Sequence, residues 1–233
     1  MKWLVRKIKR LFRVKKPSRS IPDRAQDVSR NIDSGDMYEK AMFIPDLPKL
    51  KTNAKMREDI YIIHHTAGHH KQKAIDFMRD FLKRKLCTDF MDYKGKIYIQ
   101  RDHDRAGSHI GKAKKNGRKM WTKGIGGIEI ASPGILTHKN GKFFTWFNKE
   151  VHHNEVRKVT KAQGYNCDGY FKMLTKEQES ELANYLIYLK RRHPKMEFLN
   201  HSDVAGYRGK TDLDGSLSMP LKEFVKEKVL PLV

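Results

Sequence analysis

The sequence predicts an α/β fold with a mixed central β-sheet flanked by helices, preceded by a basic amphipathic helix at the N-terminus. Two observations predict the fold class: short apolar strand patterns alternate with helical patterns after about residue 58, and glycine-containing turns separate pairs of strands. A third observation, an acid-free run of cations, sets the first residues apart. We therefore divide the chain into a helix over 1–16, a linker over 17–36 and one compact domain over 37–233.

The N-terminal segment carries a concentrated positive charge. On a helix turning 100° per residue, its apolar side chains occupy an arc of about 200° and its cations fill most of the remainder. This pattern is typical of a membrane-surface helix, with calmodulin-type or nucleic-acid binding and docking on the chain's own domain as alternatives. Cations interrupt every turn, so we expect no secretory signal peptide. The cations are Lys2, Arg6, Lys7, Lys9, Arg10, Arg13, Lys15, Lys16 and Arg19.

The composition narrows the class of partner. Lysine and arginine number 49 against 27 acidic residues, which gives a formal charge of +22. Such an excess predicts a polyanionic partner, and nucleic acid, acidic lipid and bacterial wall polymer all qualify. Apolar runs are too short for a transmembrane helix. The two cysteines, Cys87 and Cys167, have no CxxC spacing, which excludes a disulfide framework and a cysteine-only zinc site.

The elements of the compact domain follow from periodicity and turn chemistry. The linker over 17–36 contains proline, serine and glycine without sustained periodicity. A capping box of Thr175 and Gln178 opens a long helix with leucines at helical spacing. The other predicted elements are a strand at 60–63, a helix at about 71–86, a hairpin at 89–100 turning at 94–95, a strand through 128–130, a hairpin turning at Asn140-Gly141, and a closing helix at 221–229.

Two histidine positions stand out among the eleven in the chain. His64 and His65 end an apolar strand, and His201 follows a short apolar segment. Two strand-end histidines and a loop carboxylate would give zinc three protein ligands and leave a fourth position for water. The alternative is that these are polar groups satisfied at the edge of the sheet.

Two further charged residues suit hydrolytic chemistry. Glu129 lies between two isoleucines of a strand, where it either faces solvent or transfers a proton beside a metal site. Lys210 would supply a cation where negative charge develops on a tetrahedral intermediate. Each is, in isolation, more often an ordinary surface charge.

Taken together, these segments resemble the zinc-dependent N-acetylmuramoyl-L-alanine amidases of the amidase-2 family, which includes phage endolysins and is related to peptidoglycan recognition proteins. The similar motifs occur in family order and span about residues 58–230. They are IIHHTAG at 62–68, GIEI at 127–130 running to Pro133-Gly134, HSDVA at 201–205 and KTD at 210–212, with KIYIQ at 96–100 and AGSHIG at 106–111 also similar.

The resemblance implies a role for each matching residue. It implies zinc ligands at His64, His201 and Asp212, a catalytic acid at Glu129 and an oxyanion-stabilising cation at Lys210. It also implies substrate contacts at His109 and Thr66. The implied reaction is hydrolysis of the amide between N-acetylmuramic acid and the first L-alanine of the peptidoglycan stem peptide, leading to cell-wall degradation.

The sequence departs from the family pattern in two places. LDG follows KTD at 213–215 where the family usually has Pro-Gly, so Asp214 competes with Asp212 as third ligand. We favour Asp212 because it keeps the Lys-x-Asp spacing. CTDF at 87–90 replaces the usual Ser-Ala-His-Tyr, which leaves part of the substrate cleft undetermined.

The biological setting that we expect is a phage lysin. It would accumulate in the host bacterial cytoplasm before release, act on peptidoglycan as a monomer, and contact anionic membrane or lipopolysaccharide through residues 1–16. The alternatives are a non-catalytic peptidoglycan-binding protein of the same fold and a basic nucleic-acid-binding protein. No helix-turn-helix, zinc-finger or RNP signature supports the last, so we expect no specific nucleic-acid partner.

Overall fold

The computed structural model of the protein describes residues 42–43, 59–68, 76, 89–99, 113–115, 118–120, 125–205, 213 and 215–233. Several sequence predictions fall outside these residues. They concern the helix at 1–16, the linker at 17–36, most of the helix at 71–86, and the residues Cys87, His109, Lys210, Asp212 and Asp214.

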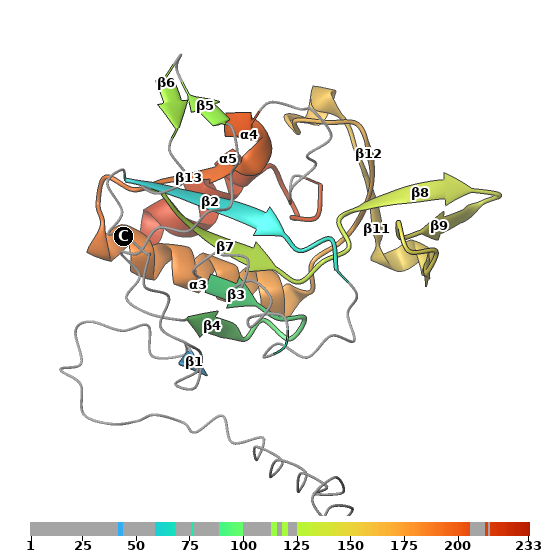
Figure 1. The fold of residues 1–233 in the computed structure, drawn as a ribbon, viewed down its shortest axis with the longest axis horizontal. Helices are drawn as coiled ribbons and strands as arrows, with labels where there is room; N and C mark the ends of the chain where they lie inside the picture. Colours follow the sequence, from blue (N-terminus) through green and yellow to red (C-terminus); the bar gives the residue numbers. More distant parts are fainter. Residues whose placement is uncertain are drawn as a thin grey trace, which may run out of the picture.

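A six-stranded mixed sheet forms the centre of the protein, as predicted (Figure 1). All neighbouring strands pair in parallel except β3 and β4, which form the predicted antiparallel hairpin. The order is β1 (Met42–Phe43), β4 (Ile97–Ile99), β3 (Asp89–Met91), β7 (Gly126–Ile130), β2 (Ile60–His65) and β13 (Glu197–Asn200).

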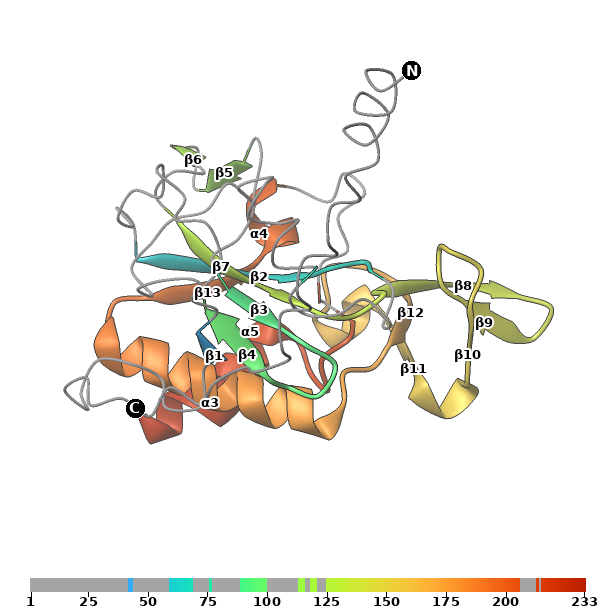
Figure 2. The same ribbon diagram turned by 60° about the horizontal axis from the view of Figure 1, so that its bottom comes forward.

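One face of the central sheet is covered by α3 (Lys176–Arg192) and α5 (Leu221–Phe224), which continues as a π-helical turn over Val225–Val229 (Figure 2). The capping box at Thr175 and Gln178 is present, which confirms the predicted helix start. Alternate residues of the strands, with leucines of α3, form the main core beneath these helices. Its members include Tyr61, Ile63, Met91, Ile128, Ile130, Leu182, Tyr185, Leu186 and Phe224.

The hairpin between β3 and β4 is fixed against the start of α3. Gly95 adopts a left-handed φ of 78°, and a Cβ there would lie 2.9 Å from the Glu177 carbonyl oxygen. The side-chain amide of Gln178 donates to the carbonyls of Asp92 (3.1 Å) and Ala131 (3.0 Å). One capping residue therefore ties α3 to two of the loops that follow strands of the sheet.

The opposite face of the sheet carries a short helix, α4 (His201–Ala205). Val204 of this helix packs with Ile60, Ile62 and Ile125 in a small second core. Alternation along β2 therefore sends odd-numbered residues 61 and 63 toward α3 and even-numbered residues 60 and 62 toward α4. Polar side chains at even positions of β2 consequently lie on the α4 face.

A second sheet of five antiparallel strands follows β7 and projects beyond the central sheet (Figure 1). Its central hairpin turns at Asn140 (φ 52°) and Gly141 (φ 74°), which confirms the predicted turn. The remaining three strands were not predicted. In sheet order the strands are β10 (Glu150–Val151), β9 (Lys142–Phe144), β8 (Ile135–Lys139), β12 (Gly169–Lys172) and β11 (Val156–Val159).

The remaining described elements are short. A two-stranded ribbon joins β5 (Ala113–Lys115) and β6 (Arg118–Met120). Single 3-10 turns occur at His153–Glu155, Lys161–Gln163 and Leu230–Leu232. Within the part of the chain that the structure describes, no helix is both long and apolar enough to span a membrane.

Candidate active site

The two histidines singled out by the sequence meet at one edge of the central sheet. β2 and β13 are parallel, and their register places Asn200 opposite Ile63. The next residue on each strand is therefore a histidine, His64 on β2 and His201 at the first position of α4. Their rings lie edge to face with centroids 4.7 Å apart, and the residues are only 3% and 4% exposed.

This buried imidazole pair fits a zinc ion. Neutral imidazole is a ligand that zinc prefers, and two imidazoles that share one zinc must lie close together. The 4.7 Å between the two ring centres meets that requirement. Within the described residues no group of three or more His, Cys, Asp or Glu could hold a metal ion. The pair supplies two candidate ligands, and both candidates for the third lie outside the described residues.

His65 does not join this pair. Its ring packs against Gly134, where an added Cβ would lie 2.3 Å from the imidazole Cε1, and its Nδ1 accepts a hydrogen bond from the Ala67 N–H at 3.1 Å. Alternation along β2 turns neighbouring side chains to opposite faces of the sheet. His64 is therefore the member of the His-His pair that faces His201.

Glu129 lies beside His64 in the neighbouring strand. The parallel register of β2 and β7 pairs these two residues directly, and paired residues of adjacent strands point to the same face. Ile128 and Ile130 turn to the opposite face and enter the core beneath α3. The Glu129 side chain is partly buried and its Oε2 atom is fully so. The sequence left open that Glu129 faces solvent. Its partly buried side chain on the His64 face does not fit that alternative.

Two aromatic residues extend the same face beyond Glu129. Phe90 of β3 is in register with Glu129, and Tyr98 of β4 is in register with Phe90. The centres of the two rings lie 6.0 Å apart. Burial is the main cause that raises the pKa of the Tyr98 hydroxyl, and the nearby carboxylate of Asp92 raises it further. Sequence reasoning did not identify either as a site residue, because only the register of β3 and β4 places them on the face of Glu129.

The loop after β2 is held by hydrogen bonds at each residue. The Thr66 N–H donates to the Ile130 carbonyl (2.9 Å), and the Gly68 N–H donates to Thr66 Oγ1 (3.1 Å). The Trp146 indole N–H donates to the Ala67 carbonyl, and the Tyr93 hydroxyl donates to the Gly68 carbonyl at 3.3 Å. Ala67 takes a left-handed φ of 50°. The predicted substrate residue Thr66 thus lies two residues after His64, in a constrained loop.

A second buried acid lies on the other face of the sheet. Asp89 is 1% exposed, and its Oδ2 accepts hydrogen bonds from the hydroxyls of Tyr185 (2.6 Å) and Tyr61. Burial raises the pKa of this carboxyl from its ordinary 3.8 to about 7, although both phenol hydrogen bonds act to lower it. Burial also raises the pKa of both tyrosines. Since Asp89 faces the α3 side, it takes no part in the His64–Glu129 face.

Comparisons with known proteins give similarities in structure only. No protein-family model and no curated protein matches the sequence. An endolysin N-acetylmuramoyl-L-alanine amidase, LysCS from Clostridium intestinale, is similar with a TM-score of 0.49 and 14% identity over 82% of this chain and 97% of that one. A selenomethionine AmpD derivative has a TM-score of 0.48 and 14% identity, covering 84% and 98%. The Drosophila peptidoglycan recognition protein SD is similar with a TM-score of 0.42 and 16% identity, over 73% of this chain and 83% of that one.

Proposed function

We propose that this protein is a zinc-dependent N-acetylmuramoyl-L-alanine amidase that hydrolyses the amide between N-acetylmuramic acid and L-alanine in peptidoglycan. One observation carries the proposal: His64, His201 and Glu129, which belong to three separate motifs, converge on one face at one sheet edge. Two buried imidazoles would supply two of the three protein ligands of a catalytic zinc site, and a carboxylate beside them could carry the proton in hydrolysis.

His64 and His201 would hold the metal, with Asp212 as the proposed third ligand. When bound, zinc supplies a Lewis acid that polarises the scissile carbonyl and lowers the pKa of water toward neutrality. Burial of both histidines limits the access of bulk water to the imidazoles. Their attachment to β2 and to the start of α4, two packed elements, fixes the rings without any substrate.

Glu129 would carry the proton in this reaction. It takes a proton from the attacking water as the new C–O bond forms at the lactyl carbonyl carbon. It then gives that proton to the L-alanine nitrogen as the C–N bond breaks, which releases a carboxylic acid and an amine. Lys210 is the proposed partner of the oxyanion that develops between these steps.

The remaining proposed residues contact substrate. Phe90 and Tyr98 continue the sheet face that carries His64 and Glu129. We propose that their aromatic side chains contact the part of the substrate next to the scissile amide. Thr66 and His109 remain proposed substrate contacts, as the motif resemblance implies. The Thr66 hydroxyl already accepts from Gly68, so a substrate would use its remaining capacity.

Replacing Glu129 by glutamine tests the proposal. Glutamine keeps the size of the side chain but removes the proton acceptor, so we expect turnover on muropeptides to fall by about 10²–10⁴ with zinc content unchanged. Glu227→Gln, on an exposed residue of the C-terminal helix, is the matched control and should change neither quantity. Wild-type turnover in Glu129→Gln would refute the assignment, and binding of peptidoglycan without any cleavage by the unaltered protein would favour a non-catalytic binder.

We propose the setting of a phage lysin that accumulates in the host cytoplasm and degrades the wall from inside. The acid-free cationic segment at 1–20 supports this setting because such a segment is attracted to anionic membranes. Cells expressing the protein should lyse only after their inner membrane is permeabilised. Lysis without permeabilisation would contradict retention in the cytoplasm.

A further inference from the structure

Trp146 is the most exposed of the large apolar side chains in the described residues, at 68%. It lies in the connection between β9 and β10 of the second sheet. Tryptophan is on average among the better-buried residue types, and it is enriched at interfaces because one end of its ring system is apolar and the other end carries a hydrogen-bond donor.

The connection that carries Trp146 is fixed. The backbone of Thr145, which is buried, donates to the Lys149 carbonyl at 2.9 Å, and the Thr145 hydroxyl accepts from the Lys149 N–H at 2.9 Å. Asn148 completes the turn with a φ of 59° and an N–H donated to the Thr145 carbonyl at 3.0 Å. The Phe147 ring meets the indole edge to face with centroids 5.3 Å apart.

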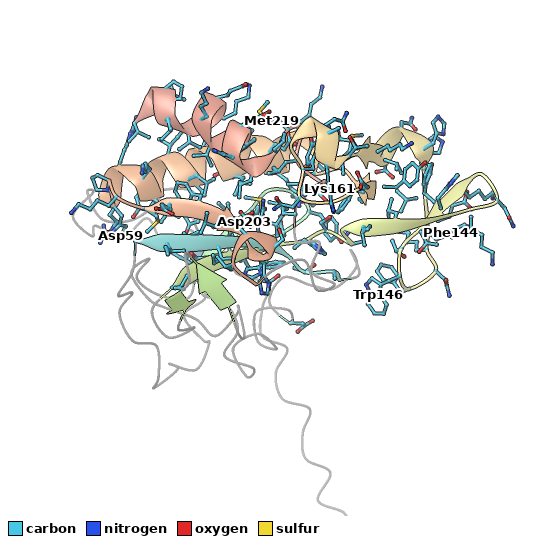
Figure 3. All side chains as sticks on the ribbon, turned by 90° about the horizontal axis from the view of Figure 1, so that it is seen from above. Asp59, Phe144, Trp146, Lys161, Asp203 and Met219 are labelled. Carbon is cyan, nitrogen blue, oxygen red and sulfur yellow. The ribbon has the colours of Figure 1, made fainter. Side chains whose placement is uncertain are left out.

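A hydrogen bond also joins Trp146 to the loop beside the candidate active site. The indole N–H donates to the carbonyl of Ala67, three residues after His64. Figure 3 shows the side chain beyond the end of β2, on the side of the central sheet away from α3. That is the side to which His64 and Glu129 turn. Because the polar edge of the indole is already used, the groups left exposed are apolar ring atoms.

We infer that Trp146 is a substrate-binding residue whose indole stacks on the pyranose ring of the N-acetylmuramoyl part of the substrate. This inference rests on the proposed amidase function. An aromatic face is electron-rich and attracts the weakly positive C–H hydrogens that line one face of a sugar ring. The stem peptide, which carries free carboxylates, is matched by cations rather than by an indole face.

A pair of substrates with the same scissile amide isolates this role. One is an N-acetylmuramoyl peptide, and the other is the corresponding N-lactoyl peptide, which lacks the sugar. For Trp146→Ala we expect KM for the muramoyl peptide to rise by about 3- to 10-fold, which corresponds to the usual binding free energy of one aromatic contact, while kcat stays nearly constant. KM on the lactoyl peptide should not change. Trp146→Phe, which keeps a ring but loses the N–H, should restore most of the affinity.

Leu230→Ala is the control for loss of an exposed apolar side chain, because Leu230 is 47% exposed and belongs to the C-terminal segment. An equal rise in KM on both substrates, or no change on either, would overturn the inference. The first result would mean that Trp146 only supports the loop after His64.

A binding measurement separates this inference from the proposed function. Titration of the disaccharide N-acetylglucosaminyl-N-acetylmuramic acid into the Glu129→Gln protein should shift the Trp146 indole N–H resonance. Affinity for the disaccharide should be nearly kept in Trp146→Phe and should fall by about 3- to 10-fold in Trp146→Ala. If the unaltered protein cleaves neither peptide, the amidase proposal fails, and this titration still decides whether Trp146 binds the sugar. Absence of binding to the Trp146-containing protein overturns the inference.

Discussion

We expect the stability of the fold to depend on pH through the buried carboxyl of Asp89. Its carboxyl is buried between the central sheet and α3, where it accepts hydrogen bonds from the hydroxyls of Tyr61 and Tyr185. Burial raises its pKa to about 7, whereas the unfolded chain releases the same proton near its ordinary pKa of 3.8. The folded protein therefore binds more protons than the unfolded chain between these two values.

The sign of the effect follows from this difference. The stability that the neutral carboxyl contributes is fully present below pH 3.8 and is lost as the pH rises through about 7. The full separation of the two pKa values corresponds to about 4 kcal/mol, of which about 3 kcal/mol falls between pH 5 and pH 8. Asparagine in place of Asp89 would keep an acceptor oxygen for the two tyrosines without titrating.

Denaturant unfolding of the full chain, with chelator present to remove pH-dependent metal binding, measures this effect. The free energy of unfolding of Asp89→Asn relative to the unaltered protein should increase by about 3 kcal/mol from pH 5 to pH 8. Asp59→Asn, on an exposed residue just before β2, should show no such change. Equal pH dependence in Asp89→Asn and the unaltered protein would refute the reasoning.

Two further predictions concern the metal and the N-terminal segment. His201→Ala should lose bound zinc by metal analysis; Asp212→Ala should also lose it while Asp214→Ala keeps it, and the reverse result would move the third ligand to Asp214. Deleting residues 1–20 should weaken binding to anionic vesicles by about 1 kcal/mol for each cation held near the surface at low salt, without changing activity on soluble muropeptides. Undiminished vesicle binding by a chain starting at residue 37 would contradict the membrane role.

Elements that depend on interactions between residues close in sequence were predicted correctly. The Thr175–Gln178 capping box and the Asn140-Gly141 turn each involve at most four consecutive residues, and both occur where the sequence indicates. The second sheet was largely missed because β10, β11 and β12 have only two to four residues each, and because β12 joins the sheet by pairing with β8, more than thirty residues earlier in the chain. Strand pairing at long range is decided by tertiary packing, which a local pattern does not contain.

The sequence allowed the residues of the candidate site to be predicted, but not their arrangement in space. Strand-end positions identified His64 and His201, but only the parallel register brings their rings to 4.7 Å and sets Glu129 beside them. Trp146 gave no signal in the sequence, because its contact with Ala67 joins residues 79 positions apart. Asp89 was missed for the same reason, since its tyrosine partners come from β2 and α3.

Mass spectrometry of purified peptidoglycan after digestion tests the central claim most directly. The account predicts new L-alanine amino termini together with free lactyl carboxyl groups on N-acetylmuramic acid. It also predicts that these products disappear with a chelator, return with added zinc and fall sharply with Glu129→Gln. Cleavage of a glycosidic or stem-peptide bond instead, or the same products at full yield in chelator, would contradict the account.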